Sequence, residues 1–131
     1  NKKTTQGLCA VWGSSSNDVF AVGFGGIIFH YNGSTWSAMT SGTTNGLLGV
    51  WGSSGSDVFA VGMSGTILHY NGSTWSSMTS GTTQTLHGVW GSSSSDVFAV
   101  GWNGTIRRYN GSTWSAMSSG TTQLNGVWGS S

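Results

Sequence analysis

The stretch VWGSSGSDVFAVGMSGTILHYNGSTW, residues 50–75, occurs three times in nearly the same form, and its repetition organises the whole chain. Val-Trp-Gly begins at residues 11, 50, 89 and 127, so that successive copies start 39, 39 and 38 residues apart. The copies cover approximately residues 6–44, 45–83 and 84–122, and a fourth one starts over residues 123–131. A fixed period of about 40 residues is typical of arrays in which each copy folds into one small unit and packs on its neighbours.

Each copy predicts four short antiparallel strands. In the middle copy they are the segment that ends in Val-Trp-Gly (47–52), Val-Phe-Ala-Val (58–61), Thr-Ile-Leu-His-Tyr (66–70) and Thr-Trp-Ser-Ser-Met (74–78). Glycine-rich and Asn-Gly turns separate these strands. Val-Phe-Ala-Val is apolar on both faces, which predicts a strand covered on both sides by neighbouring sheets. One four-stranded sheet per about 40 residues is typical of a β-propeller blade, so we predict an all-β fold of such blades.

The composition agrees with an all-β fold and excludes several partners. The 131 residues include 4 Lys and Arg against 3 acidic residues, a net charge of +1, and only 5 % of the chain is charged. Nucleic acid requires a clustered basic surface, and the only basic pairs are Lys2-Lys3 and Arg107-Arg108. No apolar run reaches the roughly 18 residues that membrane insertion needs. Glu is absent and Gly numbers 23, which favours strands joined by tight turns over helices.

Two architectures are compatible with three such copies. A β-trefoil also consists of three units of four strands, but it would close as a monomer, and its Gln-x-Trp lectin motif is missing here. Three propeller blades cannot close a ring, because known rings use about four to eight blades. Two sheet faces rich in Val, Phe and Trp would then stay uncovered. We therefore expect a homo-oligomer or part of a longer repeat array.

The quoted stretch resembles blades of bacterial β-propellers found in large secreted or surface proteins. These are similar in style to photosystem-assembly-factor-like propellers and to the Asp-box repeats of sialidases. An Asp-box has Asp two residues before the Gly, where this chain has Tyr31, Tyr70 and Tyr109. The catalytic residues of sialidases have no counterpart. The resemblance implies a propeller, a location outside the cell or at its surface, and a binding or scaffolding role.

No constellation of residues predicts catalysis, a metal site or a cofactor. The only acids are Asp18, Asp57 and Asp96, one per copy, which the repeat places on separate blades. We expect each carboxylate to accept backbone N–H groups within its own serine-rich turn. Neither a zinc-ligand spacing nor a nucleophile elbow with Asp and His partners is present. The chain is therefore predicted not to be an enzyme.

The candidate ligand-binding residues are aromatic, imidazole and turn side chains that recur once per copy. The Trp of Asn-Gly-Ser-Thr-Trp follows a turn, where a ring can be half exposed, and a Tyr and a basic residue lie close to it in sequence. One position in the Gly-x-x-Gly turn varies between copies while its surroundings do not, which indicates that packing does not dictate it. The candidates are Trp36, Trp75, Trp114, Tyr31, Tyr70, Tyr109, His30, His69, Phe24, Met63 and Trp102.

Two functions follow from this pattern. The first is a lectin-like extracellular binding module with one shallow site per blade, for a carbohydrate or a protein. Aromatic faces stack on the apolar face of a sugar, and repetition of weak sites adds avidity. The second is a structural or scaffolding unit of a surface or filamentous assembly, or a fragment of a larger propeller without binding activity of its own. Near-identical copies, scarce charge and uncovered faces fit the second function as well as the first.

Overall fold

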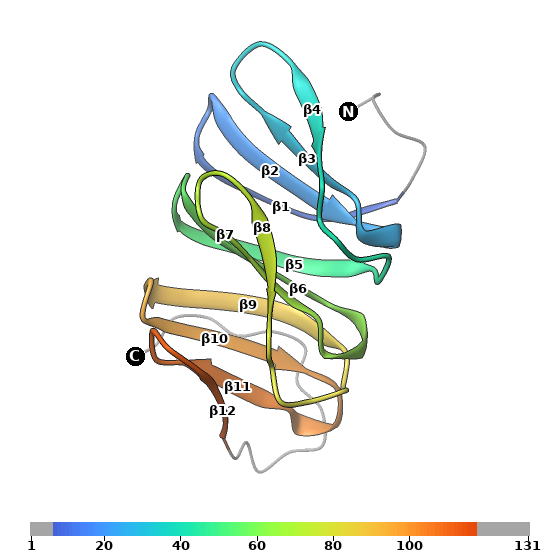
Figure 1. Cartoon of the computed structure of the whole chain (residues 1–131), viewed down its shortest axis with the longest axis vertical. Coiled ribbons are helices and arrows are strands. Elements are labelled where there is room, and N and C mark those ends of the chain that lie inside the picture. Colours follow the sequence, from blue (N-terminus) through green and yellow to red (C-terminus); the bar gives the residue numbers. More distant parts are fainter. Residues whose placement is uncertain (1–6, 118–131) are drawn as a thin grey trace.

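The computed structural model describes residues 7–117, so the predicted start of a fourth copy and the pair Lys2-Lys3 lie outside the described residues. Within this range the chain forms three four-stranded antiparallel sheets, one for each copy, stacked on one another (Figure 1). The strands of each sheet follow one another in sequence order, so each sheet is a simple meander. Between residues 7 and 117 no helix is long and apolar enough to cross a membrane.

The strand bounds repeat from one sheet to the next. The first sheet contains β1 (Leu8–Ser15), β2 (Asp18–Gly23), β3 (Ile28–Tyr31) and β4 (Trp36–Met39). The second contains β5 (Leu47–Ser54), β6 (Asp57–Gly62), β7 (Ile67–Tyr70) and β8 (Trp75–Met78). The third contains β9 (Leu86–Ser93), β10 (Asp96–Gly101), β11 (Ile106–Tyr109) and β12 (Trp114–Met117). A short 3₁₀ turn joins the second and third strands of each sheet: η1 (Phe24–Gly26), η2 (Met63–Gly65) and η3 (Trp102–Gly104).

The core lies between the sheets and not inside any one of them. Because side chains alternate along a strand, each sheet turns one apolar set toward the preceding sheet and the other toward the following sheet. Between the first two sheets, Phe20 and Ile28 pack with Val58, Leu68 and Trp75. The corresponding positions of the second and third sheets form a second cluster, which includes Phe59, Ile67, Leu86, Val97, Ala99 and Trp114. The prediction that Val-Phe-Ala-Val is covered on both sides is confirmed in β6, where all four side chains are buried.

The sheets approach one another most closely at their first strands, because β1 contacts β5 and β5 contacts β9. The fourth strand of each sheet lies at the opposite edge. Four-stranded sheets arranged in this way are β-propeller blades. The alternative prediction of a β-trefoil is wrong, because each copy pairs only within its own sheet in the described chain instead of contributing strands to a shared barrel.

The loops between the third and fourth strands show why Asn-Gly recurs. Tyr31 pairs with Trp36, so the loop has four residues, Asn32–Thr35. The side-chain oxygen of Asn32 accepts the backbone N–H groups of Ser34 and Thr35 at 2.9 and 3.0 Å. Gly33 has φ +101°, a conformation that glycine adopts without steric cost. These bonds fix the strand ends without help from another sheet.

Candidate functional site

Each blade has two ends, and the two rows of ends differ in chemistry. One row, here called the aspartate rim, contains the turns that precede Asp18, Asp57 and Asp96 together with the Asn-Gly-Ser-Thr loops. The other, here called the turn rim, contains η1, η2 and η3 and the linkers 40–46 and 79–85 that connect successive sheets. In Figure 1 the turn rim lies on the right.

On the aspartate rim, a carboxylate holds a hydroxyl and a basic side chain in every blade. His30 Nε2 lies 2.6 Å from Asp18 Oδ1, and the Ser14 hydroxyl donates to the other carboxylate oxygen. The ring of Phe20 lies 4.6 Å from the imidazole, measured between centroids. The second blade repeats this cluster with Ser53, Asp57, His69 and Phe59.

In the third blade a guanidinium takes the place of the imidazole, and the carboxylate still accepts from a basic side chain and a serine hydroxyl. Arg108 Nε donates to Asp96 Oδ1 at 3.0 Å, Ser92 donates to Oδ2, and the Arg108 Cζ lies 5.8 Å from the centre of the Phe98 ring. The basic side chain in each blade stands twelve residues after its aspartate. That constant spacing, with His or Arg at the same place, is the signal from which the pairing could have been found in the sequence.

These contacts lower the pKa of two of the carboxyl groups. Burial raises the pKa of Asp18, but the hydrogen bonds from His30 and Ser14 outweigh burial and hold this pKa below its usual value. The hydrogen bond from Ser92, followed by that from Arg108, lowers the pKa of Asp96. Both carboxylates are therefore ionised at neutral pH and serve as acceptors.

The expectation that each aspartate accepts backbone N–H groups in its own turn is wrong, because the carboxylate partners are the Ser hydroxyl and the His or Arg side chain. The cluster is also not a nucleophilic triad. In a triad the imidazole contacts the hydroxyl, whereas here the hydroxyl and the imidazole both contact the carboxylate. Residues 7–117 bring together no group of three His, Cys, Asp or Glu side chains that could hold a metal ion. The clusters therefore tie the first, second and third strands of a blade together.

Two of the three candidate stacking tryptophans are not available to a ligand. Trp75 and Trp114 are buried against the preceding blade, and the Nε1 of Trp75 lies 3.4 Å from the sulfur of Met39. The expectation that a ring placed after a turn is half exposed holds for Trp36 alone, which has no described blade on that side. Tyr70 also packs in this interface, with its ring 5.5 Å from that of Phe20. His30 and His69 are engaged by their aspartates.

On the turn rim, the variable side chains are the ones that remain exposed. Phe24, Met63 and Trp102 have relative exposures of 48, 38 and 50 %. The backbone is nevertheless fixed in the same way in each blade, because the N–H of each of these residues donates to the carbonyl that precedes the first strand of its sheet. The three distances are 3.0 Å to Gly7, 2.9 Å to Gly46 and 3.0 Å to Thr85.

The two residues after each exposed side chain reverse the chain sharply. Both have positive φ: Gly25 and Gly26 in η1, Ser64 and Gly65 in η2, and Asn103 and Gly104 in η3. A non-glycine residue in this region costs roughly 1 kcal/mol, so the rest of the turn must hold Ser64 and Asn103 there. The turn therefore presents a rigid backbone with one large apolar side chain at its tip.

Two neighbouring tips, Phe24 and Met63, lie on either side of one linker glycine. A Cβ atom placed on Gly46 would lie 3.2 Å from the Phe24 ring and 3.3 Å from the Met63 sulfur, so both side chains flank this glycine. Polar side chains link the turns to the linkers beside them: Asn45 Nδ2 donates to Thr66 Oγ1 at 2.9 Å and Asn103 Nδ2 donates to Gln84 Oε1 at 2.6 Å.

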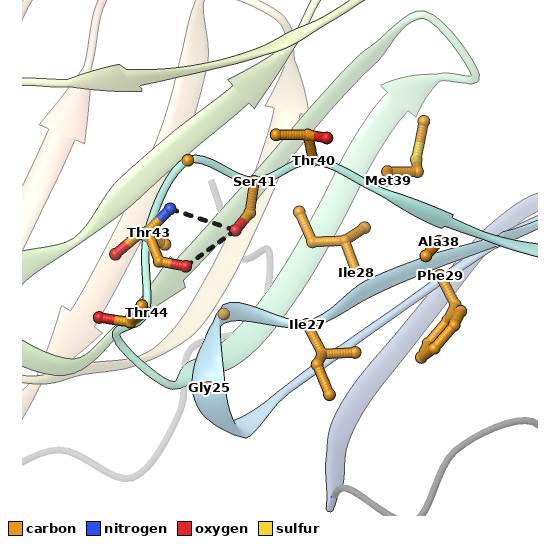
Figure 2. Close-up of a pocket in the computed structure, with 12 residues that line it drawn as sticks. Gly25, Ile27, Ile28, Phe29, Ala38, Met39, Thr40, Ser41, Thr43 and Thr44 are labelled. Carbon is orange, nitrogen blue, oxygen red and sulfur yellow. Dashed lines mark hydrogen bonds between the residues drawn. The ribbon is translucent and has the colours of Figure 1, made fainter.

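A shallow groove of about 650 Å³ lies beside η1 (Figure 2). Ile28 and Met39 form part of its apolar wall, and the linker residues Thr40, Ser41 and Thr43 contribute hydroxyls. The Ser41 hydroxyl is 3.1 Å from the carbonyl oxygen of Thr43, which shapes the linker (Figure 2). A groove of about 610 Å³ recurs at the equivalent linker of the second blade. The sequence reasoning missed these grooves, although the exact repetition of Thr-Ser-Gly-Thr-Thr at 40–44 and 79–83 was a signal.

No protein-family model matches the chain, and no curated protein matches it. Solved structures do: YCF48 bound to D1 peptide has a TM-score of 0.73 at 18 % identity, over 87 % of this chain and 40 % of that one. YCF48 from Cyanidioschyzon merolae has a TM-score of 0.76 at 17 % identity, over 92 % of this chain and 42 % of that one. The chain thus spans about two fifths of the length of these neighbours. The likeness confirms the propeller fold.

Proposed function

We propose that the chain is a non-enzymatic protein-binding module whose turn rim holds an extended segment of a partner protein. The observation that carries the proposal is the row of Phe24, Met63 and Trp102. These side chains are large, apolar and exposed, and they stand on turns whose backbone is fixed by the same hydrogen bond in each blade. The aromatic side chains have only two torsion angles and lose little conformational freedom on binding, and the flexible Met63 side chain can adapt to different apolar groups.

The chemistry of the rim defines the kind of partner. The turns 23–27, 62–66 and 101–105 and the linkers 40–46 and 79–85 contain no charged residue, but Arg107 of β11 lies against the second linker, where its Nε donates to the carbonyl oxygen of Ser80 at 2.7 Å. Such a surface suits a segment with several apolar side chains and no positive charge, which would contact the tips while its backbone bonds to the Ser, Thr and Asn side chains of the rim. YCF48 has been solved with a bound D1 peptide, which supports a peptide as the class of ligand for this propeller-like chain.

Selection of short random peptides displayed on phage tests this proposal, with the 131-residue chain as bait. We expect enrichment of peptides rich in apolar side chains. Replacing the three tips together (Phe24→Ser, Met63→Ser and Trp102→Ser) should weaken their binding at least tenfold, equivalent to about 1.4 kcal/mol. The matched control replaces three exposed serines of the aspartate rim, Ser34→Ala, Ser73→Ala and Ser112→Ala, and should leave binding unchanged. Absence of enrichment, or equal loss in both triple variants, would contradict the proposal.

A carbohydrate-binding role has less support. The aromatic faces that would stack on a sugar are mostly covered, since Trp75 and Trp114 are buried, and of the two linker grooves only the first has an aromatic residue, Phe29, in its lining. A glycan array distinguishes the two kinds of ligand. If the chain binds a sugar and the triple tip variant does not, the turn rim binds a glycan.

A further inference from the structure

Several residues on the outer faces of the first and third sheets are more exposed than the residues at the same positions that meet another sheet. On the first sheet, Val11 is 65 % exposed, and Val19, Tyr31 and Trp36 are half-buried. The equivalents of Val19 in the second and third sheets, Val58 and Val97, are fully buried. The face of the first sheet is therefore built for a contact that the described chain does not make.

The outer face of the third sheet carries the other half of that contact. Met117 is 44 % exposed and Phe98 is half-buried, whereas Phe20 and Phe59 at the same position as Phe98 are fully buried. Within the chain, each such Phe packs against a Tyr of the next sheet, with 5.5 Å between ring centroids in both interfaces. The residues that would continue this pattern are Phe98 on one face and Tyr31 on the other.

The tryptophan and glycine contacts repeat the same complementarity. Trp75 and Trp114 place Nε1 at 3.4 and 3.5 Å from the sulfur of the methionine in the preceding sheet, which leaves Met117 and Trp36 as the unused pair. A Cβ on Gly52 would lie 2.8 Å from the Trp12 ring of the first sheet, and one on Gly91 would lie 2.7 Å from Trp51. Gly13 is the equivalent glycine of the first sheet, and Trp90 is the equivalent ring of the third.

We propose that the third sheet of one copy of this chain docks on the first sheet of a second copy, and that two such joints close a ring of six blades. The occupant must supply a Val from each of its first and second strands, a Tyr from its third strand and a Trp from its fourth strand, as the internal interfaces do. Residues 118–131 contain the sequence of a first strand only, so this segment lacks the required Tyr and the second Trp. Two copies together supply six blades, which lies within the roughly four to eight blades of known rings, and a ring of two copies has two-fold symmetry.

The joint lies on the sheet faces and does not include Phe24, Met63 or Trp102. The test of the dimer is therefore independent of the test of peptide binding. Its formation would place two turn rims around one ring.

Sedimentation velocity of the 131-residue chain over a range of concentrations tests the joint. We expect a dimer of twice 13.6 kDa. Val19→Asp buries an unpaired carboxylate in both joints, and Met117→Asp does so from the opposite face, so each variant should raise the dissociation constant at least about a hundredfold. Met63→Asp, on the turn rim, is the matched control and should stay dimeric.

Circular dichroism shows whether the variants are folded, and the wild-type mass does not depend on any of them. A compact wild-type monomer would overturn the proposal, because the chain would then cover its own faces. Open chains that grow with concentration would also overturn it, since they imply a joint whose rotation does not close. Dissociation of the Met63→Asp control to the same extent would mean that the contact lies on the rim instead of the sheet faces.

Discussion

Ser64 occupies a backbone conformation that serine adopts at a cost. Its φ and ψ are 59° and 31°, and the equivalent residue of the first blade is Gly25. We predict that Ser64→Gly stabilises the chain by about 0.5 to 1 kcal/mol, because glycine has no Cβ to clash in this region. Urea unfolding measures the change.

The control for this substitution is Ser77→Gly in strand β8, where the backbone is extended. There glycine only adds freedom to the unfolded chain and should cost about 0.5 to 1 kcal/mol. Destabilisation by both substitutions would mean that the turn gains nothing from relief of strain at residue 64.

The cluster of Asp18, Ser14 and His30 makes stability depend on pH in the acid range. Since the pKa of Asp18 is lower in the folded chain than the ordinary value of 3.8, folding is favoured while the carboxylate is ionised. This contribution is fully present above pH 3.8 and is lost as the pH falls through the lowered folded pKa. Asp18→Asn should therefore be less stable than wild type at neutral pH, by about 1 kcal/mol, and the difference should shrink below pH 3.8.

Unfolding in urea at several pH values measures this difference. Ser34→Ala, on the same rim and outside the cluster, should follow the wild-type pH dependence. A constant difference between Asp18→Asn and wild type down to pH 2 would contradict the role assigned to the ionised carboxylate.

At the scale of the element, the second strand of each sheet contributes large buried side chains to the contact between blades. The ring of Phe59 on β6 meets those of His69, Tyr109 and Trp114, and it belongs to a cluster formed by two sheets. Phe59→Ala should lower the free energy of unfolding by about 3 to 5 kcal/mol, because it leaves a cavity where two blades meet.

Trp102→Ala removes a larger side chain from the turn rim and serves as the comparison. Because that ring is half exposed, its loss should change stability by no more than about 0.5 kcal/mol. Equal losses in the two variants, measured by urea unfolding, would show that the tip residues are part of the core.

The strands themselves could be predicted from the sequence, because period-two patterns and glycine-rich turns are local signals. The turn that precedes Trp75 was found in this way. The burial of the Trp75 ring could not be predicted in this way, because the ring is covered by Met39 and Phe20 of another sheet. The exposure of Phe24, Met63 and Trp102 was anticipated for the opposite reason: the residues around them repeat and they do not, so packing leaves them free.

At the scale of the whole molecule, the repeat predicted four-stranded units, but it could not distinguish stacked propeller blades from the shared barrel of a β-trefoil. Both satisfy the same strand lengths, and the difference lies in which strands pair. The pairing of β1 with β2 and the contact of β1 with β5 show that the copies form separate sheets that stack on one another. The aspartate clusters could be found from the sequence only by combining the twelve-residue spacing in every copy with the register of β2 and β3, because Asp18 and His30 meet only in that register.

The stacked blades give the molecule two unlike rims, and we propose that only the turn rim binds a partner. Hydrogen bonds within each blade occupy the carboxylates and imidazoles of the aspartate rim, whereas the apolar tips of the turn rim are exposed. A partner that binds through apolar contacts should therefore approach at the turn rim.

Amide chemical-shift changes on titration of the 131-residue chain with a selected peptide test this claim most directly. We predict that the largest changes fall on the amides of 23–27, 62–66 and 101–105 and on the linkers 40–46 and 79–85. Changes centred on the loops Asn32–Thr35 and Asn71–Thr74 of the aspartate rim would contradict it.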